Sequence, residues 1–265
     1  MDPTNSLARG MVLCVLPGLT YGFNLAPTTF GVGALLADSS PAPFAETLEG
    51  PGLLFNGTNT TLKTTNLATS GQIFPATAST PISVYFRGYQ TAAPSSFAPY
   101  ASATYDNAGT SPFFEWCLRS TATVYQVFWF PSGGGTSVNA AATPPSSGLV
   151  SICSTLVPNG NVNFFVNGAQ DANFPTAFTS AAWGTPASTG RFVMGTDLAN
   201  AGRFINNSSL LCCVWNRLLS NQEVLSLHLD PYQFLTSADI VQPFLTFIPP
   251  PPPPPVVTGW AWQEY

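Results

Sequence analysis

Charged side chains are scarce in this sequence. Lys, Arg, Asp and Glu make up 7% of its 265 residues, against about 25% in an average globular protein. Seven basic residues stand against twelve acidic ones, giving a net charge of −5, and the basic residues form no cluster. This argues against nucleic-acid binding, which requires grouped Lys and Arg facing phosphates. Such a surface suits a protein that is covered by partners or works outside cells.

The sequence also lacks a disulfide framework. Its five cysteines are odd in number and scattered, unlike the cysteines of disulfide-rich domains. Cys212 and Cys213 are adjacent, so on a strand their side chains face opposite sides and cannot readily share one metal ion. We therefore expect small buried thiols, as in a protein that folds in a reducing cytoplasm.

Long apolar runs are absent as well. No run reaches the roughly 18–20 residues that span a bilayer, so no membrane partner is expected. The segment MVLCVLPGL at residues 11–19 has the apolar character of a signal-peptide core. Only Arg9 supplies a nearby positive charge, however, and Pro17 and Gly18 interrupt the segment. We expect a buried strand there and no signal peptide.

What the sequence does contain is a repeated strand pattern. Short segments rich in Val, Ile, Phe, Tyr and Thr alternate with Gly, Pro, Ser and Asn, which is typical of an all-β sandwich. The expected strands lie at residues 52–55, 60–64, 82–88, 113–118, 125–130, 148–154, 162–166, 191–194 and 210–215. Long loops are expected at residues 89–112 and 131–148.

One helix is predicted near the end of this pattern. Ser220 is suited to its N-cap, with Glu223 completing a capping box and Leu219 forming a hydrophobic staple with the fourth helical residue. Pro231 ends the helix after two to three turns. The side chains expected to pack on the sandwich are Val224, Leu225 and Leu229.

Several motifs together resemble a known family. FVNGAQ at residues 165–170 reads as a strand that turns at Asn167 and Gly168, and RFVMGTD and VWNRLLSNQE follow it. This succession resembles the C-terminal half of laminin G-like domains with the concanavalin A-like jelly-roll fold, and LLFNGTNTTLKT resembles an early strand pair of that family. The match covers about residues 50–235. NSLARGMVL and DPYQFL are similar to variants encoded among tailed-bacteriophage structural genes.

The resemblance implies an all-β, concanavalin A-like jelly-roll β-sandwich with one short C-terminal helix and an extended proline-rich tail. Residues 1–49 would supply a strand and loops that pack on the sandwich, and residues 50–235 the laminin G-like jelly roll. A proline-rich linker at 236–255 and an aromatic docking peptide at 256–265 would follow.

The C-terminal tail has a physical reading of its own. Seven prolines at residues 249–255 form a polyproline rod on the order of 20 Å long. After it, TGWAWQEY alternates large and small residues, which suits an edge strand added to a neighbouring protein. The predicted assembly-docking residues are Trp260, Trp262 and Tyr265.

Catalysis is not expected, although concanavalin A-like folds include glycosidases. Retaining hydrolysis needs two carboxylates about 5–5.5 Å apart. Glu46 and Glu49 lie three residues apart in a Pro-rich stretch expected to be a loop, and Glu115 stands alone. Glu223 is accounted for by the capping box. The single histidine, His228, is expected at the helix surface near its C-terminal end, with no nucleophile marked beside it.

Aromatic residues are the candidates for ligand binding. In proteins of this fold, tryptophan often stacks on sugar rings. The predicted glycan-binding residues are Trp183, Trp129 and Trp116, and Trp183 is the one expected to be exposed, because Gly and Pro flank it.

Calcium is the one cofactor that the resemblance leaves open. Some laminin G-like domains bind it through Asp and Asn side chains and loop carbonyls. Residues of this type expected in loops are Asp106, Asn107, Asp171 and Asp197. Because they form no cluster of two or three acids, we expect no metal site.

The leading hypothesis is a non-enzymatic virion structural protein, acting as capsid decoration, head or neck component, or tail fibre. It would be made in the host cytoplasm, be present as a homo-oligomer or in many copies, contact other virion proteins through its tail, and bind glycans with its jelly roll. A free-standing carbohydrate-binding module and a polysaccharide-degrading enzyme are the alternatives.

Overall fold

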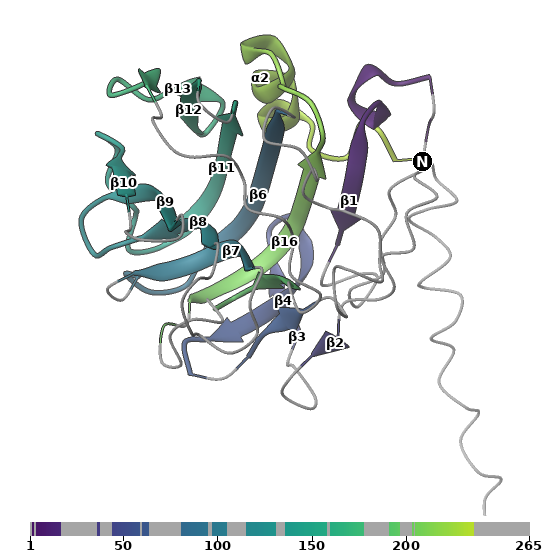
Figure 1. Ribbon diagram of the computed structural model, residues 1–265. Helices are drawn as coiled ribbons and strands as arrows, with labels where there is room; N and C mark the ends of the chain where they lie inside the picture. Colours follow the sequence, from purple (N-terminus) through teal and green to yellow (C-terminus); the bar gives the residue numbers. More distant parts are fainter. Residues whose placement is uncertain are drawn as a thin grey trace, which may run out of the picture.

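The computed structural model describes residues 2, 4–16, 36–37, 44–58, 60–63, 81–94, 97–104, 115–130, 136–157, 160–177, 191–196, 203 and 205–235, a few of the strand residues without their side chains. Two antiparallel sheets pack face to face (Figure 1). This confirms the predicted concanavalin A-like jelly-roll sandwich. The predicted linker and docking peptide, at residues 236–265, lie outside the described residues.

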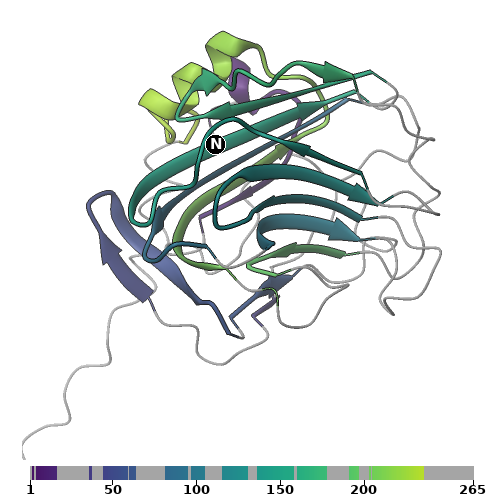
Figure 2. The same cartoon turned by 90° about the vertical axis from the view of Figure 1, so that its left-hand side faces the viewer.

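Each sheet combines strands that are distant in the sequence. The larger sheet has the order β13 (Ala169–Gln170), β12 (Asn161–Val166), β11 (Gly148–Leu156), β6 (Ile82–Gln90), β16 (Asn206–Trp215), β4 (Gly50–Asn56) and β3 (Phe44–Thr47), with β1 (Met11–Val15) pairing with β16 and β14 (Thr176–Ala177) with β12. The smaller sheet has the order β10 (Thr136–Asn139), β9 (Tyr125–Phe130), β8 (Glu115–Ser120), β7 (Ala98–Thr104), β15 (Arg191–Met194), β5 (Leu62–Lys63) and β2 (Leu36–Ala37). Figure 2 shows the two layers from the side.

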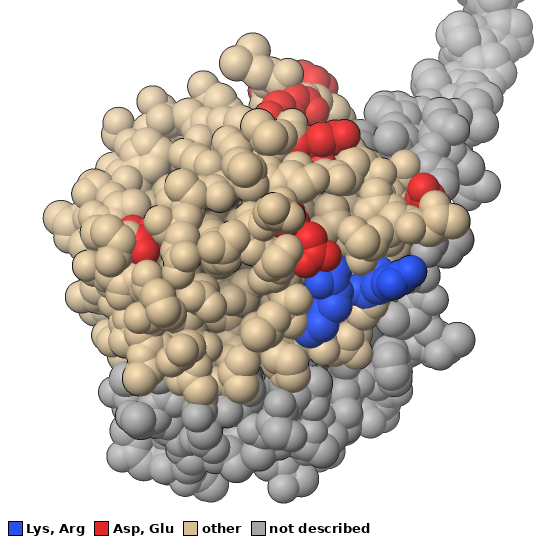
Figure 3. Space-filling view, turned by 90° about the horizontal axis from the view of Figure 1, so that it is seen from above, with Lys and Arg blue, Asp and Glu red and all other residues tan. Residues whose placement is uncertain are grey.

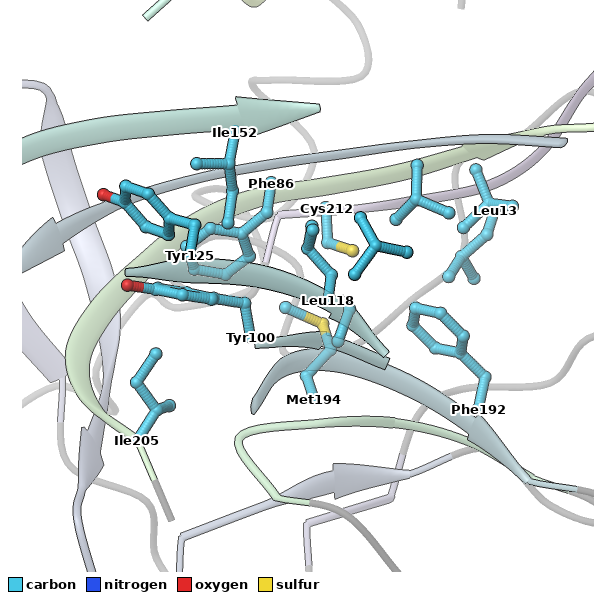
Figure 4. Packing of buried hydrophobic residues seen from close by; sticks show 14 of the residues in the cluster. Leu13, Phe86, Tyr100, Leu118, Tyr125, Ile152, Phe192, Met194, Ile205 and Cys212 are labelled. Atoms are coloured by element: carbon cyan, nitrogen blue, oxygen red, sulfur yellow. The ribbon is translucent and has the colours of Figure 1, made fainter. Parts of the chain in front are cut away.

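The main core lies between the sheets and follows from strand alternation, which sends every second side chain inward. Tyr100 of β7 lies between Phe86 of β6 and Tyr125 of β9, with ring centroids 5.0 and 6.1 Å apart. Tyr125 in turn contacts Phe164 of β12 at 5.9 Å. Figure 4 shows the rings of Phe86, Tyr100 and Tyr125 beside Leu118, Ile152 and Cys212. Tilted aromatic pairs of this kind add to the free energy gained from apolar burial.

A second apolar layer covers the outer face of the larger sheet. The helix α2 (Asn221–Leu229) and a 3₁₀ turn, η1 (Ser6–Ala8), lie over strands β6, β11 and β16. This layer is formed by Leu7, Met11, Cys14, Leu16, Tyr85, Cys153, Phe165, Leu211, Cys213, Trp215, Leu219, Val224, Leu227 and Phe234. The sandwich therefore buries apolar surface on both sides of its larger sheet.

The predicted helix is confirmed, but the prediction of which of its side chains pack on the sandwich was partly wrong. Ser220 and Glu223 form the expected capping box, and Val224 is buried. Leu225 and Leu229, however, are 46% and 74% exposed, and Leu227 is buried instead. A helix advances 100° per residue, so in a helix this short Val224 and Leu227 face the sheet while Leu225 and Leu229 turn away.

Three strands lie where the sequence predicted loops. β7 lies inside the expected 89–112 loop, β10 inside the 131–148 loop, and β3 contains Glu46. β7 reads APYASAT and β10 reads TSVN, so neither has the branched apolar run that identifies a strand. Their partners in the sheet, and not their own propensity, fix these segments as strands.

The turn predicted at Asn167 and Gly168 is confirmed. Both residues have positive φ, 50° and 80°, as a two-residue hairpin turn of this kind requires. The turn joins β12 to β13, with Val166 opposite Ala169. No helix within the described residues is long and apolar enough to cross a membrane.

Candidate functional site

A row of polar side chains crosses the outer face of the smaller sheet. Arg119 of β8 is paired with Gln126 of β9, and Gln126 is paired with Asn139 of β10. The neighbouring residues Leu118 and Val127 point into the core, so alternation places the three polar residues on the opposite face. We call Arg119, Gln126 and Asn139 the polar row.

The polar row is a directional chain of hydrogen bonds. Arg119 Nε donates to Gln126 Oε1 at 3.0 Å, and Gln126 Nε2 donates to Asn139 Oδ1 at 2.7 Å. Arg119 is 4% exposed and Gln126 8%, whereas Asn139 is exposed. Because linked hydrogen bonds polarise one another, the positive charge of Arg119 strengthens the hydrogen bond from Gln126 to Asn139 and makes the Asn139 amide a better donor.

An aromatic ring covers the buried end of the row. The Cζ atoms of Arg119 and Arg203 lie 4.5 and 5.0 Å from the centroid of the Phe97 ring, within the range of cation–π attraction. Phe97 has φ 58°, a left-handed conformation that costs on the order of 1–3 kcal/mol for such a residue. Its surroundings therefore specify where this ring lies.

The exposed end of the row is a cluster of uncharged polar groups. Ser137 is exposed two residues before Asn139 on β10, and Asn173 is exposed in the loop after β13. Asn173 Nδ2 donates to the Asn139 carbonyl at 3.2 Å. Amide and hydroxyl groups both donate and accept hydrogen bonds, as sugar hydroxyls do. We call Ser137, Asn139 and Asn173 the edge cluster.

The buried carboxylate of Asp171 binds the backbone next to this edge cluster. Its Oδ1 accepts hydrogen bonds from the backbone N–H groups of Ala141 and Asn173 at 2.8 and 3.0 Å, and its Oδ2 accepts one from Ala142 at 2.8 Å. The carboxylate, 7% exposed, thus holds two loops together. The residues Asp106, Asn107 and Asp197, considered with it for calcium, lie outside the described residues.

The roles predicted for the tryptophans and for Tyr265 remain predictions. Trp116 and Trp129 occupy directly paired positions in β8 and β9, and the structure describes their backbone only. Trp183, Trp260, Trp262 and Tyr265 lie outside the described residues. The polar row was not predicted, because its residues come from three strands and β10 was expected to be a loop. The available signal was the sequence around two of these residues: Arg119 follows Leu118, and Gln126 lies between Tyr125 and Val127. Such alternation places Arg119 and Gln126 on the face opposite to the apolar side chains.

The histidine lies beside a serine that the sequence did not mark. Ser151 Oγ of β11 is 2.9 Å from His228 Nδ1. Ser151 is 2% exposed, and a serine nucleophile must be reachable by substrate. Glu49, whose charge acts on His228, is bound by Arg87. The Ser151–His228 contact therefore joins α2 to the sheet.

Glu49 and Glu223 have similar structural roles. Arg87 Nε donates to Glu49 Oε2 at 2.6 Å, and its Nη1 donates to the His228 carbonyl at 3.0 Å. Partial burial alone would raise the pKa of Glu223, but hydrogen bonds from Arg217 and Ser220 lower it. Figure 3, viewed from the end that carries α2, shows few charged groups on that face of the described residues, with an acidic group in contact with basic ones.

Acid is expected to destabilise the protein through His228. Burial, followed by the positive charge of Arg87, lowers the pKa of His228, and Glu49 opposes this. The pKa of His228 is thus lower in the folded protein than in the unfolded chain, where it has its ordinary value of about 6.5. As the pH falls below that value, the unfolded chain binds more protons than the folded one, so stability is lost. Urea unfolding at pH 7.5 and 5.5 measures this loss. In His228→Gln the dependence should be flatter, and an unchanged dependence would contradict the assignment.

Comparison with known proteins supports the fold. No protein-family model and no curated protein matches the chain. Domain 4 of AbnA, a GH43 extracellular arabinanase of Geobacillus stearothermophilus solved with arabinotriose, is similar with a TM-score of 0.55 and 12% identity over 82% of this chain and 98% of that domain. The binding domain of Paraclostridial Mosquitocidal Protein 1 is similar with a TM-score of 0.57 and 10% identity, over 84% of this chain and 52% of that one. A Trypanosoma rangeli sialidase is similar with a TM-score of 0.53 and 14% identity, over 79% of this chain and 34% of that one.

These similarities define a class by its fold alone. The chain is a lectin-like β-sandwich that spans nearly all of the arabinanase domain, about half of the mosquitocidal binding domain and about a third of the sialidase chain. At identities of 10–14%, residue roles do not transfer between the proteins. Function must therefore be argued from this chain's own side chains.

Proposed function

We propose that this protein is a non-enzymatic β-sandwich that binds uncharged glycans at the exposed end of the polar row. The observation that carries the proposal is the aligned chain from Arg119 through Gln126 to Asn139, on a fold shared with a domain solved with arabinotriose. The buried residues fix the orientation of the Asn139 amide, so little side-chain entropy is lost when a ligand binds.

The chemistry of the edge cluster favours sugars over charged ligands. Among the described residues, Asn139 Nδ2 donates no hydrogen bond, while its Oδ1 is taken by Gln126. Its N–H groups can therefore donate to a sugar hydroxyl, with Ser137 and Asn173 alongside. A neutral ligand needs no counter-charge from an exposed ionic group. Stacking of a sugar ring on Trp183, Trp129 or Trp116 remains a separate prediction.

The absence of enzymatic activity is part of the proposal. Glu49 is held by Arg87, and Glu223 is held by Arg217 and the helix N-cap. Ser151 is buried against His228. Each of these groups, which a hydrolase would need to be accessible, instead stabilises the fold of the described chain.

Asn139→Ala is expected to weaken glycan binding about tenfold. Losing one or two net hydrogen bonds costs roughly 1–1.5 kcal/mol, and 1.4 kcal/mol corresponds to a factor of ten in Kd. A glycan array that includes arabino-oligosaccharides would identify the ligand, and calorimetry would give the affinities. Asn161→Ala is the matched control, because Asn161 is an exposed asparagine on β12 of the other sheet. Equal affinities for both variants would contradict the site.

We further propose that this binding module is a structural component of a phage particle. The support is the resemblance of NSLARGMVL and DPYQFL to phage structural proteins, the laminin G-like motif order, and the 7% charge content. The tail residues Trp260, Trp262 and Tyr265 would dock on other virion proteins. Mass spectrometry should find the chain in purified particles, and truncation before residue 256 should abolish its incorporation while leaving the sandwich folded. Its presence in lysate but not in particles would contradict this role.

A further inference from the structure

Three cysteines and a tyrosine lie on one line across the larger sheet. Cys14 of β1 is directly opposite Cys213 of β16, Cys213 is opposite Tyr85 of β6, and Tyr85 is opposite Cys153 of β11. All four side chains belong to the apolar layer on the outer face of this sheet. Cys14 and Cys213 are therefore neighbours on adjacent strands and on the same face.

The two thiols also contact each other. A hydrogen bond between the side chains of Cys14 and Cys213 contributes to the raised pKa of Cys213, after the larger effect of burial. Directly opposed residues of antiparallel strands have Cα atoms about 4.5–5.5 Å apart, which falls within the range of about 4.4–6.8 Å found for disulfides. The backbone therefore need not move for these two sulfur atoms to be joined.

We propose that Cys14 and Cys213 form an oxidation site that closes to a cross-strand disulfide in the presence of a low-molecular-weight disulfide such as oxidised glutathione. One cysteine thiolate attacks the oxidant and releases the first glutathione thiol, leaving a mixed disulfide. The second thiolate then attacks the cysteine sulfur of that mixed disulfide and releases the second thiol. The protein loses two hydrogen atoms, and the oxidant is reduced to two thiols.

The geometry selects this pair among the described cysteines. Cys212 is opposite Val15 and belongs to the core between the sheets (Figure 4), so its side chain faces away from Cys14. Cys153 is separated from Cys213 by the strand that carries Tyr85. Two strand spacings amount to about 9.6 Å, which is too far for a disulfide.

Burial determines when the reaction takes place. Cys14 and Cys213 are both 0% exposed, so an oxidant cannot reach either sulfur atom in the folded protein, and burial raises the pKa of the Cys213 thiol. The disulfide forms as β1 docks on β16, or when β1 transiently detaches. Once closed, it holds the N-terminal strand to a central strand of the sandwich, which suits a protein that folds in a reducing cytoplasm and then works outside cells.

The test is to refold the full chain from urea in a buffer containing reduced and oxidised glutathione. Thiols titrated in denaturant should fall from five to three, since one disulfide consumes two. A non-reducing digest should contain one linked peptide that joins Cys14 to Cys213. The oxidised protein should melt roughly 5–15 °C above the same protein kept reduced, as expected for a disulfide that closes a long loop.

Two variants separate the pair from the other cysteines. Cys212→Ala should keep the cross-link and the rise in melting temperature, whereas Cys14→Ala should lose both. Five remaining thiols in correctly refolded wild-type protein would overturn the proposal. So would a stable glutathione adduct, or a cross-link to Cys153.

Discussion

Trp215→Ala is expected to lower the free energy of unfolding by about 3–5 kcal/mol, which is a large part of the stability of an ordinary domain. Trp215 is 0% exposed in the apolar layer beneath α2. Its Nε1 donates to the Leu7 carbonyl at 2.6 Å, so one side chain joins β16 to the N-terminal segment. Truncation removes the ring and leaves both a cavity and a buried carbonyl without its donor.

Urea denaturation measures this effect, with two variants for comparison. Trp215→Phe keeps most of the ring but loses the N–H group, so it should lie between wild type and Trp215→Ala. Leu229→Ala removes an apolar side chain that is 74% exposed and should change stability by no more than about 0.5 kcal/mol. If Trp215→Ala were as mild as Leu229→Ala, the second apolar layer would not contribute to the stability of the fold.

Glu49→Ala is expected to cost about 3 kcal/mol, because it leaves a buried charge without its partner. The side chain of Arg87 is 5% exposed and that of Glu49 is 24% exposed. Arg87 also donates to the His228 carbonyl at the end of α2. Removing the carboxylate therefore leaves a buried guanidinium facing the His228 carbonyl and the Tyr85 hydroxyl, neither of which carries a charge.

The double variant Glu49→Ala with Arg87→Met separates charge from packing. Methionine fills part of the space of the arginine stem without a charge to solvate, so the double variant should regain a substantial part of the stability lost in Glu49→Ala. Chemical denaturation of wild type, both single variants and the double variant completes the cycle. A double variant as unstable as the sum of the two single variants would show that the ion pair is not a coupled unit.

Local sequence patterns were sufficient for the elements that carry their own signals. The capping box at Ser220 and Glu223 and the turn at Asn167 and Gly168 are encoded within a few residues. Strand β9 was predicted with its observed bounds, Tyr125–Phe130, because aromatic and branched residues fill it. Such signals depend on backbone geometry and on side chains close in sequence.

Features that depend on pairing between distant segments could not be predicted in the same way. β7 is a strand because β8 and β15 pair with it, although its own residues are mainly small. The polar row requires the registers of β8, β9 and β10 together. The facing of Cys14 and Cys213 likewise depends on the pairing of β1 with β16. A single sequence gives no direct information on these registers.

The central claim is that glycans bind at the exposed end of the polar row, and an NMR titration tests it most directly. The side-chain amide signals of Asn139 and Gln126, assigned with the help of the Asn139→Ala variant, are followed as the oligosaccharide selected on the array is added. We predict that both signals shift in proportion to the bound fraction while the Asn161 amide stays unchanged. Saturated binding with no shift at Asn139 and Gln126 would contradict the account.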